Sequence, residues 1–300
     1  MIKHMAHLDY QDVYMKHSLK GYVMSADELR SVQLIELELL CEVDRICRKC
    51  GITYRIVAGT LLGAVRHGGF IPWDDDADIA FLRAEYEQFR IACEAELDTS
   101  RFYFQDHRNT PGYRWGYGKL RRKGTEFVRL GQEHMPYEQG IFIDIFPYDY
   151  VPESTLLRQF HCFKCFLFRK VFWSPVGLRT TRGFVRLVYA ALKKIPAQSL
   201  YSSFQRFIVK SNKCESGWIR ILTFPTPTWD HGYKRKWADK TSEYMFEGVN
   251  FLGPTEYDEY MTFKFGDYMT LPPENERKTH PISRLTIVSQ EASSENTTSS

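Results

Sequence analysis

The stretch GTLLGAVRHGGFIPWDDDADIA, residues 59–80, places four carboxylates within five positions between two apolar segments. Like charges at this spacing repel one another, and the repulsion grows where the carboxylates lose contact with water. A chain that keeps these acids at the edge of an apolar core is therefore expected to hold a cation there.

The composition is that of a soluble globular protein. The 300 residues are 43% hydrophobic and 26% charged, which allows one large domain or two smaller ones. The net charge of +3 is too small to indicate nucleic-acid binding, so no nucleic-acid partner is expected. Aromatic residues make up 15% of the chain, which fits a large core, a sugar-stacking surface or a membrane-facing patch.

The sequence shows no pattern typical of export or membrane insertion. Residues 1–10 lack the apolar segment of a signal peptide, and no stretch reaches the roughly 18 apolar residues of a spanning helix. The seven cysteines have no disulfide-framework spacing, which indicates reduced thiols. We therefore expect a cytoplasmic protein.

The first half of the chain alternates helices and strands. Ser25 and Glu28 form a capping box, and apolar residues at helical spacing predict a helix over 26–50 that ends at Gly51. This order of elements predicts an α+β fold, with a mixed sheet core and flanking helices. The other predicted elements are a helix over 84–97 and strands over 52–58, 79–82, 101–105, 113–120, 126–130 and 140–147, the last stopped by Pro147.

From residue 152 the chain is expected to be helical and rich in loops. Helices are predicted over 156–173, 180–192 and 204–212, and residues 229–273 are expected to form ordered loops and short elements over a core. The predicted organisation is an N-terminal extension over 1–24, a core over 25–150, a C-terminal part of the same domain over 151–288, and a disordered tail over 289–300.

Three carboxylates are the candidate metal ligands and catalytic groups. Asp76 and Asp78 are expected on one strand, where side chains two positions apart share a face. Asp144 lies in the apolar run Ile-Phe-Ile-Asp-Ile-Phe, where an unpaired carboxylate is costly. Together the three acids are suited to hard divalent cations, Mg²⁺ or Mn²⁺, and such a site suits phosphoryl transfer. An acidic cluster by itself is more often a solvated turn, and Asp74 and Asp75 are expected to shape the loop or form an outer shell.

The residues before the acids fit the same chemistry. Gly59 and Thr60 are expected to open a short helix, whose free amides can bind a phosphate. Arg66, Lys119 and Arg121 are candidates for neutralising a diphosphate, although individually they could be ordinary surface charges.

Two further patterns have simpler alternatives. The pairs Cys47/Cys50 and Cys162/Cys165 would form a four-thiolate zinc site only if the fold brought them together, and both pairs fall in expected helices. Residues 160–173 and 184–192 interleave basic and bulky apolar side chains, a pattern of peripheral membrane association. A core or a partner face is the more common reason for such a pattern.

The motifs resemble the LicD family of phosphotransferases, which includes fukutin and the fukutin-related protein. The segment from Gly59 to Asp78 matches the family signature, 140–147 resembles its second acidic strand, and 266–280 resembles its C-terminal block. The resemblance covers about residues 25–282. The C-terminal block has a single His280 before Pro281, so the resemblance assigns no role to His280.

The resemblance implies a nucleotidyltransferase-like core and a specific reaction. Asp76, Asp78 and Asp144 would be the metal carboxylates, and Gly59 with Thr60 would form the phosphate turn. The reaction would transfer a phospho-alcohol, phosphocholine from CDP-choline in the best-known case, to a hydroxyl of a cell-surface glycan or lipid-linked precursor and release CMP. A cytoplasmic enzyme of this kind would act at the inner face of the membrane.

Two alternatives stay open at this point. A CDP-ribitol or CDP-glycerol donor fits the same residues, because the groups that would contact the alcohol are unknown. A non-catalytic glycan- or nucleotide-binding relative is the alternative from another class, although such a protein has no need to keep three acids.

Overall fold

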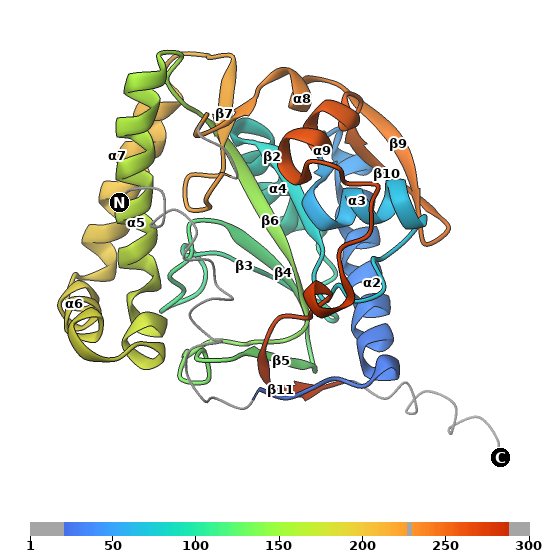
Figure 1. The fold of residues 1–300 in the computed structure, drawn as a ribbon, viewed down its shortest axis with the longest axis horizontal. Helices are drawn as coiled ribbons and strands as arrows, with labels where there is room; N and C mark the ends of the chain where they lie inside the picture. The colour runs from blue at the N-terminus through green and yellow to red at the C-terminus, as the bar shows by residue number, and fades with distance from the viewer. Residues whose placement is uncertain (1–20, 227–229, 288–300) are drawn as a thin grey trace.

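The computed structural model describes residues 21–226 and 230–287, and its fold is α+β as the sequence predicts. The N-terminal extension predicted over 1–24 lies almost wholly outside the described residues, and the tail predicted over 289–300 lies entirely outside them. A mixed sheet forms the centre, with β6 crossing its middle (Figure 1).

The sheet is built around one parallel pair of strands, β2 and β6, and its other neighbours are antiparallel. The order is β1-β2-β6-β4-β3, and β7 continues from β6 to β8. The strands are β1 (Arg55–Ile56), β2 (Asp78–Leu82), β3 (Phe102–Gln105), β4 (Gly118–Arg122), β6 (Phe142–Tyr150), β7 (Trp218–Arg220) and β8 (Tyr233–Lys234).

Pro147 does not stop the sixth strand, contrary to the prediction. Strand β6 continues to Tyr150 because Pro147 lies between the segment of β6 that pairs with β4 and the segment that pairs with β7. Pairing with β4 ends at Ile145, and pairing with β7 begins at Asp149. The Asp144 N–H points toward β2, so an N–H at position 147 would point into that gap. The N–H that proline lacks is therefore not needed there.

Helices α2 (Ala26–Cys50) and α4 (Arg83–Glu96) cover one face of the sheet. The predicted capping box at Ser25 is present, and Gly51 ends α2 with a φ of 66°, as predicted. Ile79, Ile143 and Phe81 are fully buried beneath these helices. Because side chains alternate between the two faces of a strand, Asp78 and Asp144 lie on the face opposite these helices.

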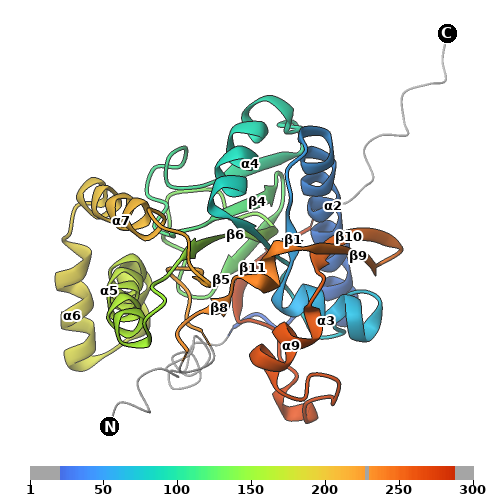
Figure 2. The same ribbon diagram turned by 90° about the horizontal axis from the view of Figure 1, so that it is seen from above.

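The acidic face is covered by later parts of the chain, which lie beside α3 in both views (Figures 1 and 2). A second two-stranded pairing, β5 with β11, closes the lower edge. The elements are α3 (Ala58–His67), β5 (Glu126–Arg129), α8 (Lys236–Asp239), β9 (Thr241–Phe246), β10 (Val249–Pro254), α9 (Tyr257–Phe265), η2 (Glu274–Glu276) and β11 (Ile282–Thr286).

Helices α5 (Thr155–Thr180), α6 (Gly183–Lys193) and α7 (Ala197–Ser211) stand together on one side of the molecule (Figures 1 and 2). They confirm the helices expected after residue 152. Cys165 and Phe172 of α5 share a small apolar core with Leu200 and Phe204 of α7. Among the described residues, no helix is long and apolar enough to cross a membrane.

Two predicted strands are shorter in the structure. The strand expected over 52–58 is reduced to Arg55–Ile56, because α3 already begins at Ala58. The strand expected over 113–120 forms only as Gly118–Arg122, since pairing with β3 and β6 starts there. Residues 233–265, expected as loops and short elements, include the six-residue hairpin strands β9 and β10 and the helix α9.

Candidate active site

Three charged side chains form a row across adjacent strands. In the parallel pair, Asp78 of β2 lies directly opposite Asp144 of β6. In the next pair, Lys119 of β4 lies opposite Asp144, and the Lys119 ammonium forms an ion pair with the Asp144 carboxylate. Partners in register share a face of the sheet. The register therefore brings together two of the predicted carboxylates and one of the predicted cations.

Asp76 lies beside this row but not on the strand. The prediction that Asp76 and Asp78 share a strand is wrong, because β2 begins at Asp78. Strand β1 has only two residues, which pair with Ala80 and Ile79, so β1 offers no partner to the residues before Asp78. Asp76 is nevertheless close enough to raise the pKa values of both Asp78 and Asp144.

Burial dominates the electrostatics of the row. It raises the pKa of Asp78 well above its ordinary value, and the charges of Asp76 and Asp144 add to the rise. Burial also raises the pKa of Asp144, which the neighbouring Lys119 opposes. Burial lowers the pKa of Lys119 to about 8, although Asp144 limits the fall. The raised pKa values of Asp78 and Asp144 therefore come first from burial, and repulsion by neighbouring acids adds to them.

The start of α3, where the phosphate turn is predicted, contacts the loop of residues 74–77 before β2, which we call the acidic loop. The Thr60 hydroxyl accepts a hydrogen bond of 2.7 Å from the Asp78 N–H, which ties the helix to the first residue of β2. A Cβ at Gly59 would lie 2.5 Å from Asp74 Oδ2, so only glycine allows Asp74 this close. Burial raises the pKa of Asp74 well above its ordinary value, and Asp76 and Asp75 add to this. An acid thus already lies beside the turn.

Asp75 is held by structural contacts. Its buried carboxylate accepts hydrogen bonds from Arg129 Nη1 at 3.1 Å, from the His280 backbone N–H at 3.0 Å and from His280 Nδ1 at 2.8 Å. Burial alone would raise its pKa, but Arg129 and His280 bring it below the ordinary value. Arg129 Nη2 and His280 Nδ1 also lie 3.5 Å from Asp76. These contacts fix the loop that carries Asp76.

The other two predicted cations do not join the row. Arg66 lies in the last turn of α3, where its Nη1 donates to the Tyr268 carbonyl at 2.7 Å. Arg121 is buried, and its guanidinium donates to Gln105 Oε1 and to the Gly140 carbonyl, both at 2.7 Å. Arg121 therefore braces the sheet next to Asp144, and no contact links Arg66 with the acids in the described part of the chain.

Sequence reasoning missed several residues that α2 and the C-terminal part contribute. Gln33 Nε2 donates to the carbonyls of Ile71 and Asp74, at 3.3 and 3.0 Å, and so anchors the segment that leads into the acids. Glu36, one turn later, is buried, and its Oε2 has no hydrogen-bond partner within the described residues. Burial raises the pKa of Glu36 well above its ordinary value, with Asp76 the next cause. The sequence signal that could have identified them is that Gln33 and Glu36 are polar residues on the buried face of α2.

Helix α9 contacts the N-terminus of α3 and places a positive charge near the row. The Tyr260 hydroxyl accepts a hydrogen bond of 3.3 Å from the Ala58 N–H, the first of α3. Lys264, one turn further along α9, lies near enough to lower the pKa of Asp78. Sequence reasoning missed both residues, which lie in a region expected to be mostly loops.

The donor chemistry fits a hard cation, although the described residues contain no group of three His, Cys, Asp or Glu in a geometry that could hold a metal. The charges of Asp76 and Asp144 raise the pKa of Asp78, and that of Asp76 raises the pKa of Asp144, an effect that a divalent cation would relieve. The metal site is therefore still a prediction. The same search of the described chain covers both cysteine pairs, so the structure gives no support for the zinc site.

The fold and site define an α+β protein with a buried acidic centre on one face of a mixed sheet. Residues 51–189 match the family described as LicD/FKTN/FKRP, nucleotidyltransferase domain. Over 272 residues the chain is 30% identical to the lipopolysaccharide cholinephosphotransferase LicD of Haemophilus influenzae, covering 87% of this chain and 98% of that protein. The chain belongs to the LicD family.

Shorter matches join the chain to uncharacterised proteins of two Rickettsia species. The Rickettsia typhi protein is 43% identical over 82 residues, or 25% of this chain and 26% of that protein. The Rickettsia prowazekii protein is 46% identical over 48 residues, or 16% and 18% of the two chains. These partial matches add no information on activity.

Proposed function

We propose that this protein transfers phosphocholine from CDP-choline to a hydroxyl of a cell-surface glycan or its precursor and releases CMP. Its similarity to the Haemophilus influenzae cholinephosphotransferase, over nearly all of that protein, supports a choline-phosphate donor and a glycan acceptor. The observation that carries the chemistry is the register of Asp78, Asp144 and Lys119 across three strands.

Asp76, Asp78 and Asp144 would hold Mg²⁺, or Mn²⁺ in its place. The ion would neutralise the diphosphate oxygens and the charge that develops on CMP. The buried setting strengthens such charge stabilisation because little water screens it. Lys119 pairs with Asp144 and holds that carboxylate in the row.

In the proposed transfer, the acceptor hydroxyl oxygen bonds to the phosphorus of the choline phosphate, and the bond from this phosphorus to the oxygen of CMP breaks. Asp144 takes the hydroxyl proton. Its place in the row, in register with Asp78 on one side and Lys119 on the other, puts it beside the proposed reacting centre. Thr60 and the first amides of α3 would orient a donor phosphate from the other side of Asp78.

The test uses the purified full chain with Mg²⁺ and a glycan acceptor. CDP-choline, CDP-ribitol and CDP-glycerol are supplied in separate reactions, and both CMP release and label transfer to the glycan are measured. CDP-choline should be the preferred donor, and EDTA should abolish the transfer. Preference for CDP-ribitol or CDP-glycerol would replace the donor but keep the reaction class.

Single substitutions test the proposed roles of the acids. Asp78→Asn and Asp144→Asn should each lower the rate about 100-fold or more, because each removes a charge from the reacting centre. Asp98→Asn is the matched control, since its partly exposed carboxylate accepts hydrogen bonds from Ser100 and Arg101 rather than from residues of the row. Full activity of a folded Asp144→Asn protein would exclude Asp144 as the base. No CMP from any of the three donors would reject the enzyme itself.

A further inference from the structure

The three helices α5, α6 and α7 carry charge of one sign. Residues 154–214 contain twelve Lys and Arg and no Asp or Glu, although the whole chain has 37 acidic residues and a net charge of +3. The helices stand together on one side of the molecule (Figures 1 and 2). Positive potential is therefore concentrated on this side.

Helix α5 exposes a stripe of large apolar side chains. Leu156, Phe160, Phe163 and Leu167 recur at helical spacing, and Phe160 and Phe163 are 61% and 59% exposed. The opposite side of the same helix carries Cys165, which is buried in the small core shared with α7. The stripe therefore faces away from the core that holds the helices together.

Helix α6 exposes a second apolar set. Phe184 and Leu187 are 78% and 68% exposed, while Tyr189 is buried and packs against α5 at Gly177. Arg186 and Lys193 of the same helix are exposed as well. The two segments, for which a membrane surface, a core or a partner face was expected, thus have both buried and exposed aromatic residues. Their inner aromatic residues are core, and their outer ones are not.

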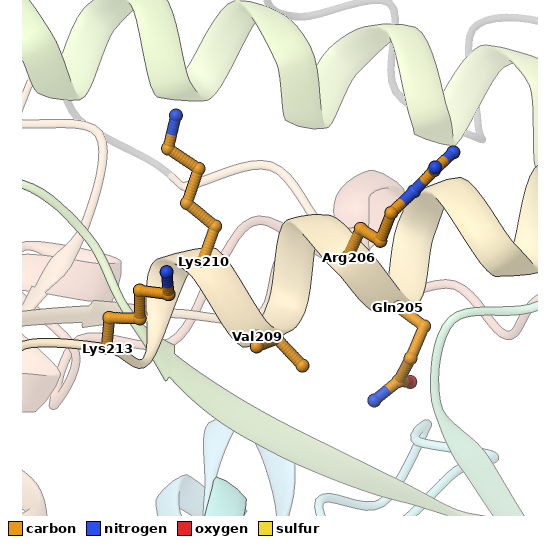
Figure 3. A pocket seen from close by; sticks show the side chains of 5 residues that line it. All are labelled: Gln205, Arg206, Val209, Lys210 and Lys213. Carbon is orange, nitrogen blue, oxygen red and sulfur yellow. The ribbon is translucent and has the colours of Figure 1, made fainter.

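Helix α7 adds a basic pocket to this side. An open pocket of about 460 Å³ is lined by Gln205, Arg206, Val209, Lys210 and Lys213. Figure 3 shows Arg206, Lys210 and Lys213 projecting from α7 and its C-terminal end. With three cationic side chains and no acidic one in its lining, the pocket suits an anionic group.

We propose that the exposed face of α5 and α6 docks on the surface of a membrane that contains anionic phospholipids. Bulky apolar side chains would enter the boundary between headgroups and acyl chains, and the surrounding Lys and Arg would contact the phosphates. The uniform positive charge of residues 154–214 matches an anionic lipid surface, whereas the centres of protein interfaces are depleted in charged residues. The proposal concerns where the chain binds and does not depend on the transfer chemistry.

The experiment measures co-sedimentation of the full chain with phospholipid vesicles. Vesicles of phosphatidylcholine alone are compared with vesicles that also contain about 30% phosphatidylglycerol. Binding is expected to the anionic vesicles, and about 0.5 M salt should weaken it at least tenfold because it screens the charges. Absence of binding to the anionic vesicles, or equal binding to both kinds, would overturn the proposal.

Substitutions identify the face. The double variants Phe160→Ser/Phe163→Ser and Phe184→Ser/Leu187→Ser should each weaken vesicle binding about tenfold or more, since each removes two apolar anchors. Ile91→Ser on α4, at a position 57% exposed, is the matched control and should bind normally. All four positions are exposed, so the thermal midpoints should stay close to that of the parent.

Two outcomes would reject this face. Unchanged binding of both double variants would place the membrane contact elsewhere. A dimer that the Phe160→Ser/Phe163→Ser variant dissociates, seen by light scattering without vesicles, would mean that a second copy covers the stripe.

Discussion

The buried contacts of Asp75 allow a quantitative prediction about the acidic loop. Asp75→Ala removes a carboxylate that is 1% exposed and leaves Arg129 and His280 without their shared partner. Breaking a buried ion pair from one side typically costs about 3–5 kcal/mol. Arg129 keeps its 3.5 Å contact with Asp76, and the His280 side chain is partly exposed, so we expect a value near the lower limit. Asp75→Asn keeps one acceptor oxygen and should cost about 1–2 kcal/mol less.

The assay is equilibrium unfolding by urea, followed by tryptophan fluorescence. A double-mutant cycle of Asp75→Ala with Arg129→Met should give a coupling energy of about 2 kcal/mol or more, because the second substitution removes the stranded charge. Glu126→Ala is the control, since its 3.9 Å contact with Arg284 joins two exposed side chains on the same pair of strands. That change should cost at most about 0.5 kcal/mol. A loss below about 0.5 kcal/mol for Asp75→Ala would refute the assigned role of the ion pair.

Three further predictions concern other contacts. Thr60→Val should cost about 1–3 kcal/mol in urea unfolding, because the Asp78 N–H loses its acceptor, whereas Thr60→Ser should keep most of the stability. Gly63→Ala should cost about 1–3 kcal/mol in the same assay, since the new Cβ would lie 2.4 Å from the Gly69 carbonyl oxygen; a variant as stable as the parent would contradict this. Burial lowers the pKa of His161 to about 4, below the ordinary 6.5 of the unfolded chain. Its contribution to stability should therefore be complete above about pH 6.5 and decline as the pH falls toward 4, and thermal unfolding of His161→Gln should show a weaker dependence on pH over this range.

Local chemistry explains which elements could be predicted from the sequence. The helix from Ala26 to Cys50 has its own start and stop signals, a capping box at Ser25 and a left-handed Gly51, so no distant contact is needed to place it. The strand carrying Asp144 was predictable for a similar reason, because residues 141–146 form a short, almost continuous apolar run that is typical of a buried strand. The end of this strand was not predictable, because Pro147 fits within it only where pairing with β4 has ended and pairing with β7 has not yet begun.

The parts of the site that depend on distant pairing could not be predicted. Asp76 was misplaced on a strand because β2 extends only as far as β1 can pair with it. Strand β1 is short because α3 begins at Ala58, and the sequence of β2 carries no information about that position. Arg129 and His280 meet Asp75 only because β5 and β11 pair across more than half the chain. Phe160 could not be separated from Phe172 without knowing which side of α5 packs on α7.

The pairing of β11 with β5 also bears on the order in which the protein is made. His280 and β11 are among the last described residues to leave the ribosome, yet His280 is a partner of Asp75, which lies in the first third of the chain. A nascent chain that ends before residue 280 therefore has the acidic loop without the hydrogen bonds that His280 donates to Asp75. The loop can reach its final arrangement only after residue 280 has been synthesised, so chains that stop before this residue should lack the finished acidic centre.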